Sequence, residues 1–355
     1  MINQNAIVQH IRKILPAALD IKITRLGSGV HGAGFLADVN TPSGNKRYVL
    51  KALFPENLGH DYPSDRAASF LLDLDEFATI PRHVKALDVL AELQDGTVKS
   101  IGGGIEYYLL MEKASGTDYF TDLRAMRDKE SLTASDKLKI KLVAEYVAEL
   151  QSVKKESRSL YWRKLRDTIG HGECLMGVFD SYPDKVLSYR QMAAIEKLCI
   201  DWRARLKHKS HRLCRVHGDL HPGNIWFNDE GTDFIALDRS RGPWGDAADD
   251  ISAFAINFVF FSILLKGNYS GAYKQALDEF IRIYIDETSD SEVLEIIAPF
   301  LAFRGAVVAN PAFYPELSPD NRKKIFAFIK GVLLDKRFEP GRIQDYIQSA
   351  SAAKP

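Results

Sequence analysis

The stretch VHGDLHPGNIWFNDEGTDFIALDRSRGPWGDAADD, residues 216–250, decides the fold that this chain is expected to adopt. Two apolar runs, residues 224–227 and 234–237, flank a turn-forming Asp-Glu-Gly sequence. Short apolar runs on either side of a glycine-containing turn are typical of a β-hairpin. Such a hairpin would bring Asp238, at its end, to the loop that carries Asp219 and Asn224.

These three side chains are the set that phosphoryl transfer requires. One carboxylate orients the attacking hydroxyl, and two further oxygen donors hold Mg²⁺ on the nucleotide phosphates. We therefore interpret the stretch as a kinase-type site. Asp219 is the predicted catalytic residue, which accepts the proton of the hydroxyl or aligns it, and Asn224 and Asp238 are the predicted metal ligands.

Length and composition are those of an ordinary globular protein. The 355 residues suffice for two domains or one bilobal unit, and 46% of them are hydrophobic. The 47 basic and 47 acidic residues cancel, so no net field attracts nucleic acid or an anionic membrane. We expect neither as a partner.

The cysteines and the apolar segments indicate a cytoplasmic protein. The three cysteines have no metal-like spacing and cannot all pair, which favours a reducing compartment. The first residues show no signal pattern. The most apolar stretch, residues 251–265, is interrupted by polar residues and is shorter than the roughly 20 residues that span a membrane. It is predicted to be a buried core helix.

Periodicity divides the chain into a sheet-rich part and a helical part. Alternation predicts strands over residues 21–26, 35–40, 47–53, 84–93 and 106–111, and helical spacing predicts helices over 7–15 and 64–78. Further helices are predicted over 135–153, 189–208, 251–265, 271–286, 291–308 and 321–334. We predict an α+β, bilobal fold with an N-lobe, residues 1–112, and a helical C-lobe, residues 113–355. The chemistry is expected in the cleft between them.

A glycine-rich segment carries the pattern G-x-G-x-x-G at Gly27, Gly29 and Gly32. In a dinucleotide-binding fold such a loop leads directly into a helix. Here it leads into a predicted strand, a turn and another strand. This favours a hairpin over nucleotide phosphates, where glycine permits close approach of the backbone. The predicted cofactor-binding residues of this segment are Gly27, Ser28, Gly29 and Gly32.

Lys51 lies between apolar residues in the third predicted strand. A half-buried lysine is costly unless it is paired, and phosphate oxygens with a carboxylate from the next helix would resolve that cost. A surface lysine that extends to solvent is the alternative. With the glycine segment ahead of it, we predict that Lys51 binds nucleotide and pairs with Asp65.

Two alternatives compete with the kinase interpretation. His217, Asp219 and His221 form a His-x-Asp-x-His sequence that also suits a metal-dependent hydrolase, but this explains neither Asn224 nor Lys51. A pseudokinase that binds nucleotide without transfer is disfavoured because all the predicted catalytic, metal and nucleotide residues are present. Among the acidic residues before the apolar helix, Asp250 is expected to brace the catalytic loop by accepting its backbone N–H groups.

Taken together, these residues resemble the aminoglycoside phosphotransferase/choline kinase family of small-molecule kinases, which shares the protein-kinase-like fold. The resemblance rests on H-x-D-x-x-x-x-N at residues 217–224, on Asp238, and on G-D-x-x-x-D at residues 245–250. It covers roughly residues 20 to 335. Protein kinases usually carry Asp-Phe-Gly at the metal aspartate, whereas this chain has Asp238-Arg239-Ser240, which favours the small-molecule branch.

The resemblance implies transfer of the γ-phosphate of ATP, with Mg²⁺, to a hydroxyl of a sugar, amino sugar, amino alcohol or aminoglycoside. It implies that the backbone near Glu112 and Ala114 bonds the adenine. It also implies that the segment before the catalytic loop shapes the acceptor pocket. The candidate acceptor residues are His171, Glu173, Asp246 and Arg304. The acidic ones suit an amine or sugar hydroxyls, and Arg304 suits an acid.

Overall fold

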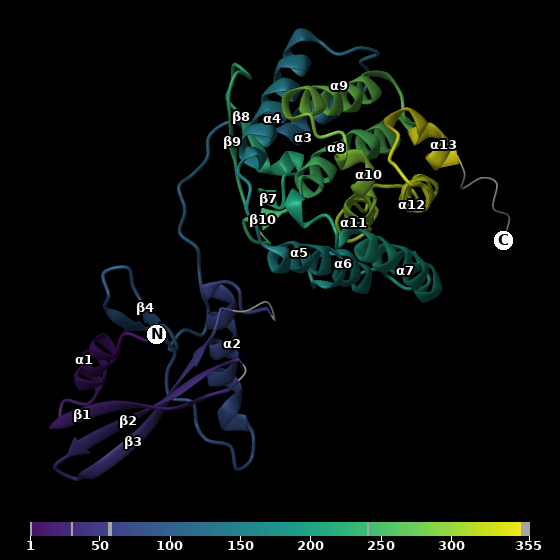
Figure 1. Cartoon of the computed structure of the whole chain (residues 1–355). Coiled ribbons are helices and arrows are strands. Elements are labelled where there is room, and N and C mark those ends of the chain that lie inside the picture. The colour runs from purple at the N-terminus through teal and green to yellow at the C-terminus, as the bar shows by residue number, and fades with distance from the viewer. Residues whose placement is uncertain (1, 30, 56–58, 240, 349–355) are drawn as a thin grey trace. The chain divides into compact units, whose positions relative to one another are not determined.

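The chain divides after Met111 into two units of different architecture (Figure 1). The computed structural model describes residues 2–29, 31–55, 59–239 and 241–348. The N-terminal unit, Met1–Met111, is built on antiparallel strands, and the C-terminal unit, Glu112–Pro355, is mainly helical. The predicted α+β class is confirmed.

The N-terminal unit contains a three-stranded antiparallel sheet in the order β1-β2-β3. Its strands are β1 (Asp20–Ser28), β2 (Gly32–Thr41) and β3 (Gly44–Leu53). Ile21 pairs with Val39 in this sheet, and both pack with Ile7 and Ile11 of the helix α1 (Gln4–Ile14). Because side chains alternate along a strand, this core occupies one face of the sheet only.

The rest of this unit contains less strand than the sequence predicts. It comprises α2 (Pro63–Glu76), η1 (Phe77–Thr79), β4 (Leu90–Glu92) and β5 (Val98–Ser100). The strand predicted over residues 84–93 is reduced to β4, and residues 106–111 form none. Leu109 and Leu110 are instead almost fully exposed. The local pattern suits a strand, but no described strand pairs with it, and a strand without ladder bonds is not stable.

The C-terminal unit is a helical assembly with short strand pairs on its surface. It begins with β6 (Thr117–Asp118), α3 (Tyr119–Ala125), α4 (Ala134–Ser152), α5 (Arg158–Gly170), α6 (Leu175–Asp180), α7 (Tyr189–Leu206), η2 (Ser210–Arg212) and β7 (Cys214–Arg215). It continues with η3 (Pro222–Asn224), β8 (Ile225–Phe227), β9 (Phe234–Ala236), β10 (Trp244–Gly245), α8 (Ala247–Lys266) and α9 (Gly271–Thr288). The last elements are α10 (Val293–Ile296), α11 (Ala298–Val308), α12 (Pro319–Leu334), η4 (Pro340–Arg342) and α13 (Ile343–Gln348).

Helix α8 forms the core of this unit. Figure 1 shows it in the interior, with α9 and α11 on either side, and it contacts both. Its 20 residues are long and apolar enough to cross a membrane by composition, yet 89% of its apolar window is buried inside the protein. It is therefore the buried core helix that the sequence predicts.

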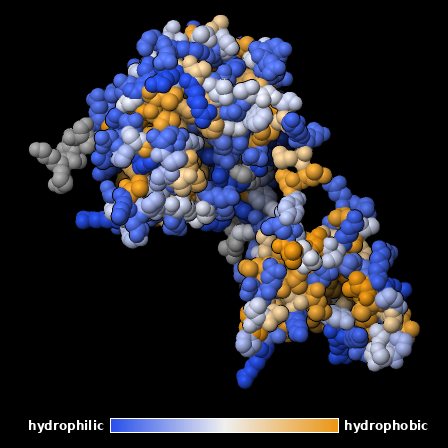
Figure 2. Space-filling model, turned by 180° about the vertical axis from the view of Figure 1, so that it is seen from behind, coloured by the Kyte–Doolittle hydropathy of each residue, from blue (hydrophilic) through white to orange (hydrophobic). Residues whose placement is uncertain are grey.

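Exposed hydrophobic side chains are unevenly distributed. Most of the large ones that the described residues expose belong to residues 1–111, among them Leu26 and Val49 on the sheet. On the face shown in Figure 2 the C-terminal unit is mostly hydrophilic, with hydrophobic residues in small groups. The N-terminal unit thus offers apolar surface that its own core does not use.

Candidate active site

The predicted catalytic loop, residues 217–224, is fixed by the first turn of α8. The backbone N–H groups of His217 and Gly218 donate to Asp250 Oδ2 and Oδ1, at 2.9 Å and 2.8 Å. Burial, together with repulsion from neighbouring Asp249, raises the pKa of Asp250 above its ordinary value. The bracing contact predicted for Asp250 is confirmed.

Asp219 and Asn224 are tied to each other within this loop. The Asn224 side-chain Nδ2 donates to the Asp219 carbonyl oxygen at 2.9 Å, and the His221 backbone N–H donates to the same oxygen. Because its amide nitrogen is engaged there, Asn224 presents its amide oxygen in the other direction. That oxygen is the atom a metal ion would bind.

The predicted hairpin is confirmed and brings Asp238 to this loop. Ile225 pairs with Ala236 across β8 and β9, and the pairing continues because the Leu237 backbone N–H donates to the Asn224 carbonyl oxygen at 2.9 Å. Asp238 follows directly, in the left-handed conformation with φ 51°, which aspartate tolerates better than most residues. The register places Asp238 opposite the end of the catalytic loop. Ser240, predicted as part of the same motif, lies outside the described residues.

Two arginines meet the carboxylate of Asp219. Arg304 Nη1, from α11, donates to Asp219 Oδ1, and Arg241 Nη1 lies 2.9 Å from the same oxygen. Burial would raise the pKa of Asp219, but the two positive charges outweigh it and hold that pKa well below its usual range. Asp219 is therefore ionised at neutral pH. Within the described parts of the chain, Oδ2 of Asp219 has no hydrogen-bond donor.

A second pair of charges lies behind Arg304. Its Nη2 is 3.2 Å from Asp249 Oδ1, and the other oxygen of Asp249 contacts Lys164 Nζ. Lys164, Asp249 and Arg304 are almost fully buried, so each charge depends on its opposite neighbour. The position of Asp219 consequently rests on α5, α8 and α11 together.

A cavity of about 510 Å³ opens beside Asp219 within the C-terminal unit. Its charged lining residues are Glu173, Asp219, Arg241 and Arg304, and most of the remaining wall is apolar, from α6, α8 and α11. Asn257 of α8 also lines it. The Asn257 Nδ2 donates to the Ala253 carbonyl oxygen at 2.7 Å, whereas its buried Oδ1 has no partner within the described residues.

The four predicted acceptor residues do not all reach this cavity. Glu173 and Arg304 line it, and His171, at the C-terminal end of α5, does not. The prediction for Asp246 is wrong. Asp246 is fully buried, accepts from Tyr161 and Arg212, and caps α8 through the Ala248 N–H. These contacts make it a structural residue, and sequence reasoning did not foresee Arg241 or Asn257.

In the N-terminal unit the described glycines of the glycine-rich segment lie at the end of β1 and the start of β2. Gly29 N–H donates to the Gly32 carbonyl oxygen at 2.9 Å, and a strand follows rather than a helix, which excludes the dinucleotide-binding arrangement. A Cβ at Gly32 would lie 2.2 Å from the Ala52 carbonyl oxygen, so only glycine fits there. Val30 lies outside the described residues.

The carboxylate partner predicted for Lys51 is wrong. Lys51 Nζ lies 3.3 Å from Asp73 Oδ2 in the later turns of α2. Asp65 instead caps the start of α2, where its Oδ2 accepts from the Tyr62 backbone N–H at 2.8 Å. The sequence interpretation assumed that the early turns of the helix lie nearest the strand, whereas its later turns do.

The segment that carries Glu112 and Ala114 has neither helix nor strand, and Glu112 is exposed. Nothing in its own conformation prevents its backbone groups from bonding a ligand. The next residues enter β6, which pairs Thr117 with Phe227 of β8. This segment thus leads directly into the strand pairing with β8, which follows the catalytic loop.

The metal-hydrolase alternative lacks a suitable ligand cluster. Within the described parts of the chain, no group of three or more His, Cys, Asp or Glu side chains could hold a metal ion. His217 Nδ1 accepts from the Asp219 N–H, and His221 Nδ1 accepts from the Gly223 N–H. Both histidines therefore stabilise the conformation of the catalytic loop.

Comparison with known families identifies the class of protein. The model of the phosphotransferase enzyme family, abbreviated APH, matches residues 22–280. This chain belongs to that family. The match covers both the glycine-rich turn and the catalytic loop. No curated protein matches the chain.

Several solved structures are similar at low sequence identity. An ethanolamine kinase from Plasmodium vivax is 12% identical, with a TM-score of 0.35, over 94% of this chain and 82% of that one. A glucosamine kinase is 13% identical, with a TM-score of 0.39, over 97% of each chain. An aminoglycoside phosphotransferase from Streptomyces rimosus, in complex with ADP and streptomycin, is 13% identical, with a TM-score of 0.33, over 85% and 99%.

Proposed function

We propose that this phosphotransferase is a kinase that transfers the γ-phosphate of ATP, with Mg²⁺, to a hydroxyl of a small molecule. The observation that carries the proposal is Asp219, an ionised carboxylate at a cavity. Two arginines hold one of its oxygens, and the other has no hydrogen-bond donor among the described residues. An oxygen so placed can accept a hydrogen bond from an alcohol. This bond orients a lone pair of the alcohol oxygen toward the γ-phosphate.

The exposed side chains on the sheet face opposite α1 support nucleotide binding. Val49 and Lys51 flank Leu50, whose partly buried side chain packs against the core beside α1. Both therefore project from the opposite face of the sheet. Leu26 borders Gly34 on that same face, and Leu26 and Val49 are 58% and 66% exposed. The apolar patch suits an adenine ring, and the adjacent glycines and lysine suit a triphosphate.

Asn224 and Asp238 would hold the metal ion. An amide oxygen and a carboxylate are hard oxygen donors, and a nucleotide-bound Mg²⁺ takes only one or two protein ligands in addition to phosphate oxygens and water. The absence of a larger ligand cluster among the described residues agrees with this. When bound, the ion would neutralise charge that develops on the phosphates.

In the transfer, the acceptor hydroxyl oxygen forms a bond to the γ-phosphorus as the bond to the β,γ-bridging oxygen breaks. The hydroxyl proton passes to Asp219 Oδ2 or to solvent. Because the pKa of Asp219 lies well below its usual range, it is a weak base. Its contribution is therefore to orient the hydroxyl, which is the larger part of catalysis in this chemistry.

A phosphoryl-transfer screen tests the proposal. Purified protein is incubated with Mg²⁺ and γ-labelled ATP over sugars, amino sugars, amino alcohols, hydroxy acids and aminoglycosides. We expect label transfer that depends on Mg²⁺ and on Asp219. ATP binding without transfer to any acceptor would instead support a non-catalytic nucleotide-binding module.

We also propose a cytoplasmic location. The three cysteines are buried and form no disulfide, as is usual in a reducing compartment.

A further inference from the structure

We propose that the acceptor is an uncharged alcohol with a mainly apolar body, and that this body lies in the cavity beside Asp219. The inference rests on the proposed kinase function and narrows it. The family resemblance alone points instead to sugars, amino sugars, amino alcohols and aminoglycosides, which are polar or cationic. The overall reaction is that ATP and the alcohol give ADP, the phosphate monoester of the alcohol and a proton.

The charged residues that line the cavity are balanced and already paired. Glu173 and Asp219 contribute two negative charges. Arg241 and Arg304 contribute two positive charges, and both contact Asp219 Oδ1. Glu173 is 64% exposed and 3.8 Å from Arg241 Nε, so solvent and that arginine screen it. Burial lowers the pKa of His221, which is therefore neutral at neutral pH. A charged acceptor would lose its hydration without gaining a free partner of opposite charge among the described residues.

The uncharged polar side chains of the lining are largely occupied as well. Ser181 Oγ donates to the Val178 carbonyl oxygen and accepts from Asn310 Nδ2, both at 2.7 Å. Asn257 Nδ2 donates to a backbone carbonyl oxygen of its own helix at 2.7 Å, and its Oδ1 is buried. The additional hydroxyl groups of a sugar would exchange water for few protein partners, which disfavours a polyol in this cavity.

The rest of the wall is mainly apolar and comes from three helices and one connection. Val178 belongs to α6, Ile256 to α8 and Val307 to α11. Phe313 and Tyr314 lie in the connection between α11 and α12. The Tyr314 hydroxyl bonds no described residue, which leaves room for one further polar atom. The volume of about 510 Å³ is in the range of sites that hold drug-sized molecules, so a sizeable apolar body fits.

Phe313 offers a ligand the largest exposed apolar contact of this wall. It lines the cavity and is 53% exposed. The connection that carries it is held in place, because the backbone N–H groups of Phe313 and Tyr314 donate to the carbonyl oxygen of buried Asn310. Arg322 of α12 holds the end of the connection through the Leu317 carbonyl oxygen at 2.8 Å. The exposed ring is therefore fixed at the cavity, and an apolar acceptor body would remove it from water.

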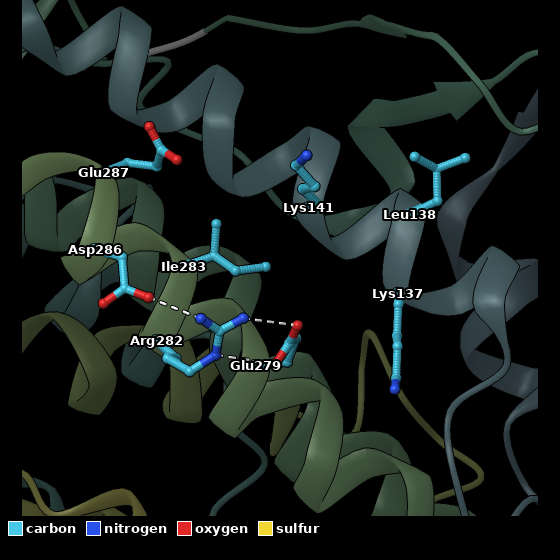
Figure 3. A pocket seen from close by; sticks show the side chains of 8 residues that line it. All are labelled: Lys137, Leu138, Lys141, Glu279, Arg282, Ile283, Asp286 and Glu287. Atoms are coloured by element: carbon cyan, nitrogen blue, oxygen red, sulfur yellow. Dashed lines mark hydrogen bonds and ion pairs between the residues drawn. The ribbon is translucent and has the colours of Figure 1, made fainter.

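A second groove of this unit has the opposite character. Figure 3 shows it between α4 and α9, where six of the eight lining side chains are ionisable. Among them Arg282 bonds Glu279 at 2.9 Å and Asp286 at 2.7 Å. An apolar wall is thus particular to the cavity beside Asp219 and is not shared by this groove. Leu138 of α4, which lines the groove and is 39% exposed, supplies a control position.

Matched acceptors test the proposal. Steady-state transfer from MgATP is measured with 1-heptanol against 6-aminohexan-1-ol and 6-hydroxyhexanoate, which end in an ammonium and a carboxylate group. Cyclohexylmethanol against glucose compares an apolar ring with a polyol, each with a hydroxymethyl group. We expect a kcat/KM at least roughly tenfold higher for the apolar member of each comparison, because the polar one is desolvated without compensation. A kcat/KM for glucose or for either charged alcohol that equals or exceeds that of its apolar counterpart overturns the proposal.

A homologous series measures burial of the body directly. From 1-butanol to 1-heptanol, kcat/KM should rise roughly threefold for each added CH₂, as expected for transfer of a methylene out of water. Phe313→Ser is expected to lower kcat/KM for 1-heptanol about tenfold and to flatten the series. Phe313→Leu should retain most of the rise, and Leu138→Ser should change nothing. A series that is flat in the wild type, or as steep in Phe313→Ser, overturns the placement of the body in this cavity.

Calorimetric binding distinguishes failure of this inference from failure of the kinase function. The wild-type protein, with Mg²⁺ and a non-hydrolysable ATP analogue, is titrated with 1-heptanol and with 6-aminohexan-1-ol. Tighter binding of 1-heptanol, weakened in Phe313→Ser, supports the apolar site even if no transfer occurs. Transfer to glucose or to 6-aminohexan-1-ol, with no tighter binding of 1-heptanol, refutes the inference while the kinase function stands.

Discussion

The carboxylate of Asp219 has two different oxygens. Oδ1 is fixed by two arginines, and Oδ2 has no described donor. A single substitution can therefore remove the proposed orienting role of Asp219 without changing the proposed metal ligands, Asn224 and Asp238. Such a division of roles can be tested at the level of one side chain.

We predict that Asp219→Asn lowers kcat by roughly a hundredfold or more, because it replaces the oxygen that orients the hydroxyl with an N–H donor. MgATP affinity should stay within a few-fold. Asp238→Ala should weaken MgATP binding itself. Equilibrium binding of a fluorescent ATP analogue, alongside turnover, measures both. Equal losses of affinity in the two variants would contradict the assigned roles.

The pKa of Asp219 leads to a prediction about pH. Nearby positive charges favour the ionised form, so wild-type kcat/KM should not fall through the ordinary carboxyl range as pH decreases toward 4. In Arg241→Gln the pKa of Asp219 should rise, and the acidic decline should move to higher pH. Profiles of kcat/KM with glycerol, a neutral acceptor, measure this. Identical acidic limbs in both proteins would show that Asp219 does not set them.

At the scale of an element, the start of α8 has the most consequences. Asp246 caps the helix and pairs with Arg212, Asp249 pairs with Lys164 and Arg304, and Asp250 holds the catalytic loop. Carboxylates in a first turn are favoured by the helix dipole. Here each of these carboxylates also holds another part of the C-terminal unit in place.

We predict that Asp246→Ala lowers the free energy of unfolding by about 3 kcal/mol, because it leaves a buried arginine partly unpaired and removes a cap. Asp290 and Glu292 still contact Arg212 and limit the loss. Denaturant unfolding measures the change. Asp320→Ala, an exposed first-turn carboxylate of α12, serves as the control. A similar loss in both variants would show that burial is not the cause.

Local patterns predicted the elements that have a strong period or a clear turn. The hairpin at 225–236 and the helices α4, α7, α8, α9 and α12 were predicted within a few residues. The helix predicted over 291–308 is divided into α10 and α11. The helices α3, α5 and α6 were missed because their apolar residues follow no long periodic run.

The site was predicted where it depends on adjacent residues and missed where it depends on tertiary packing. The contact between Asp250 and the loop followed from the motif. The sequence did not indicate that Lys51 pairs with Asp73, that Asp246 is buried or that Arg241 approaches Asp219. These depend on how helices pack and on a positive-φ turn at Arg241, which no local pattern specifies.

At the scale of the whole molecule, the connection between the units is an exposed apolar segment. Tyr108, Leu109 and Leu110 are 84% exposed or more and have no regular structure. Exposed chain without backbone pairing is a preferred site of proteolysis. If the backbone near Glu112 and Ala114 bonds the adenine, as the family resemblance implies, the nucleotide should order this segment.

We predict that chymotrypsin cleaves first within residues 107–111, and that saturating MgATP slows this cleavage several-fold. Mass spectrometry of the fragments over time measures the position and the rate. MgGTP is a useful comparison, because weaker protection would indicate a preference for adenine. Cleavage at the same rate with and without nucleotide would argue against binding at this segment.

The chain of alternating charges from Lys164 to Asp219 has a consequence for how this enzyme could diversify. The helix-end carboxylates that support the reaction lie on α8, while the arginines that face the cavity come from α11 and the turn at residue 241. Because Arg241 and Arg304 also hold Asp219, only cavity residues outside this chain of charges, such as Asn257 of α8, could be exchanged by selection or by directed evolution to accept new alcohols. The loop that aligns the hydroxyl would persist through such changes, so new specificities are accessible without rebuilding the scaffold.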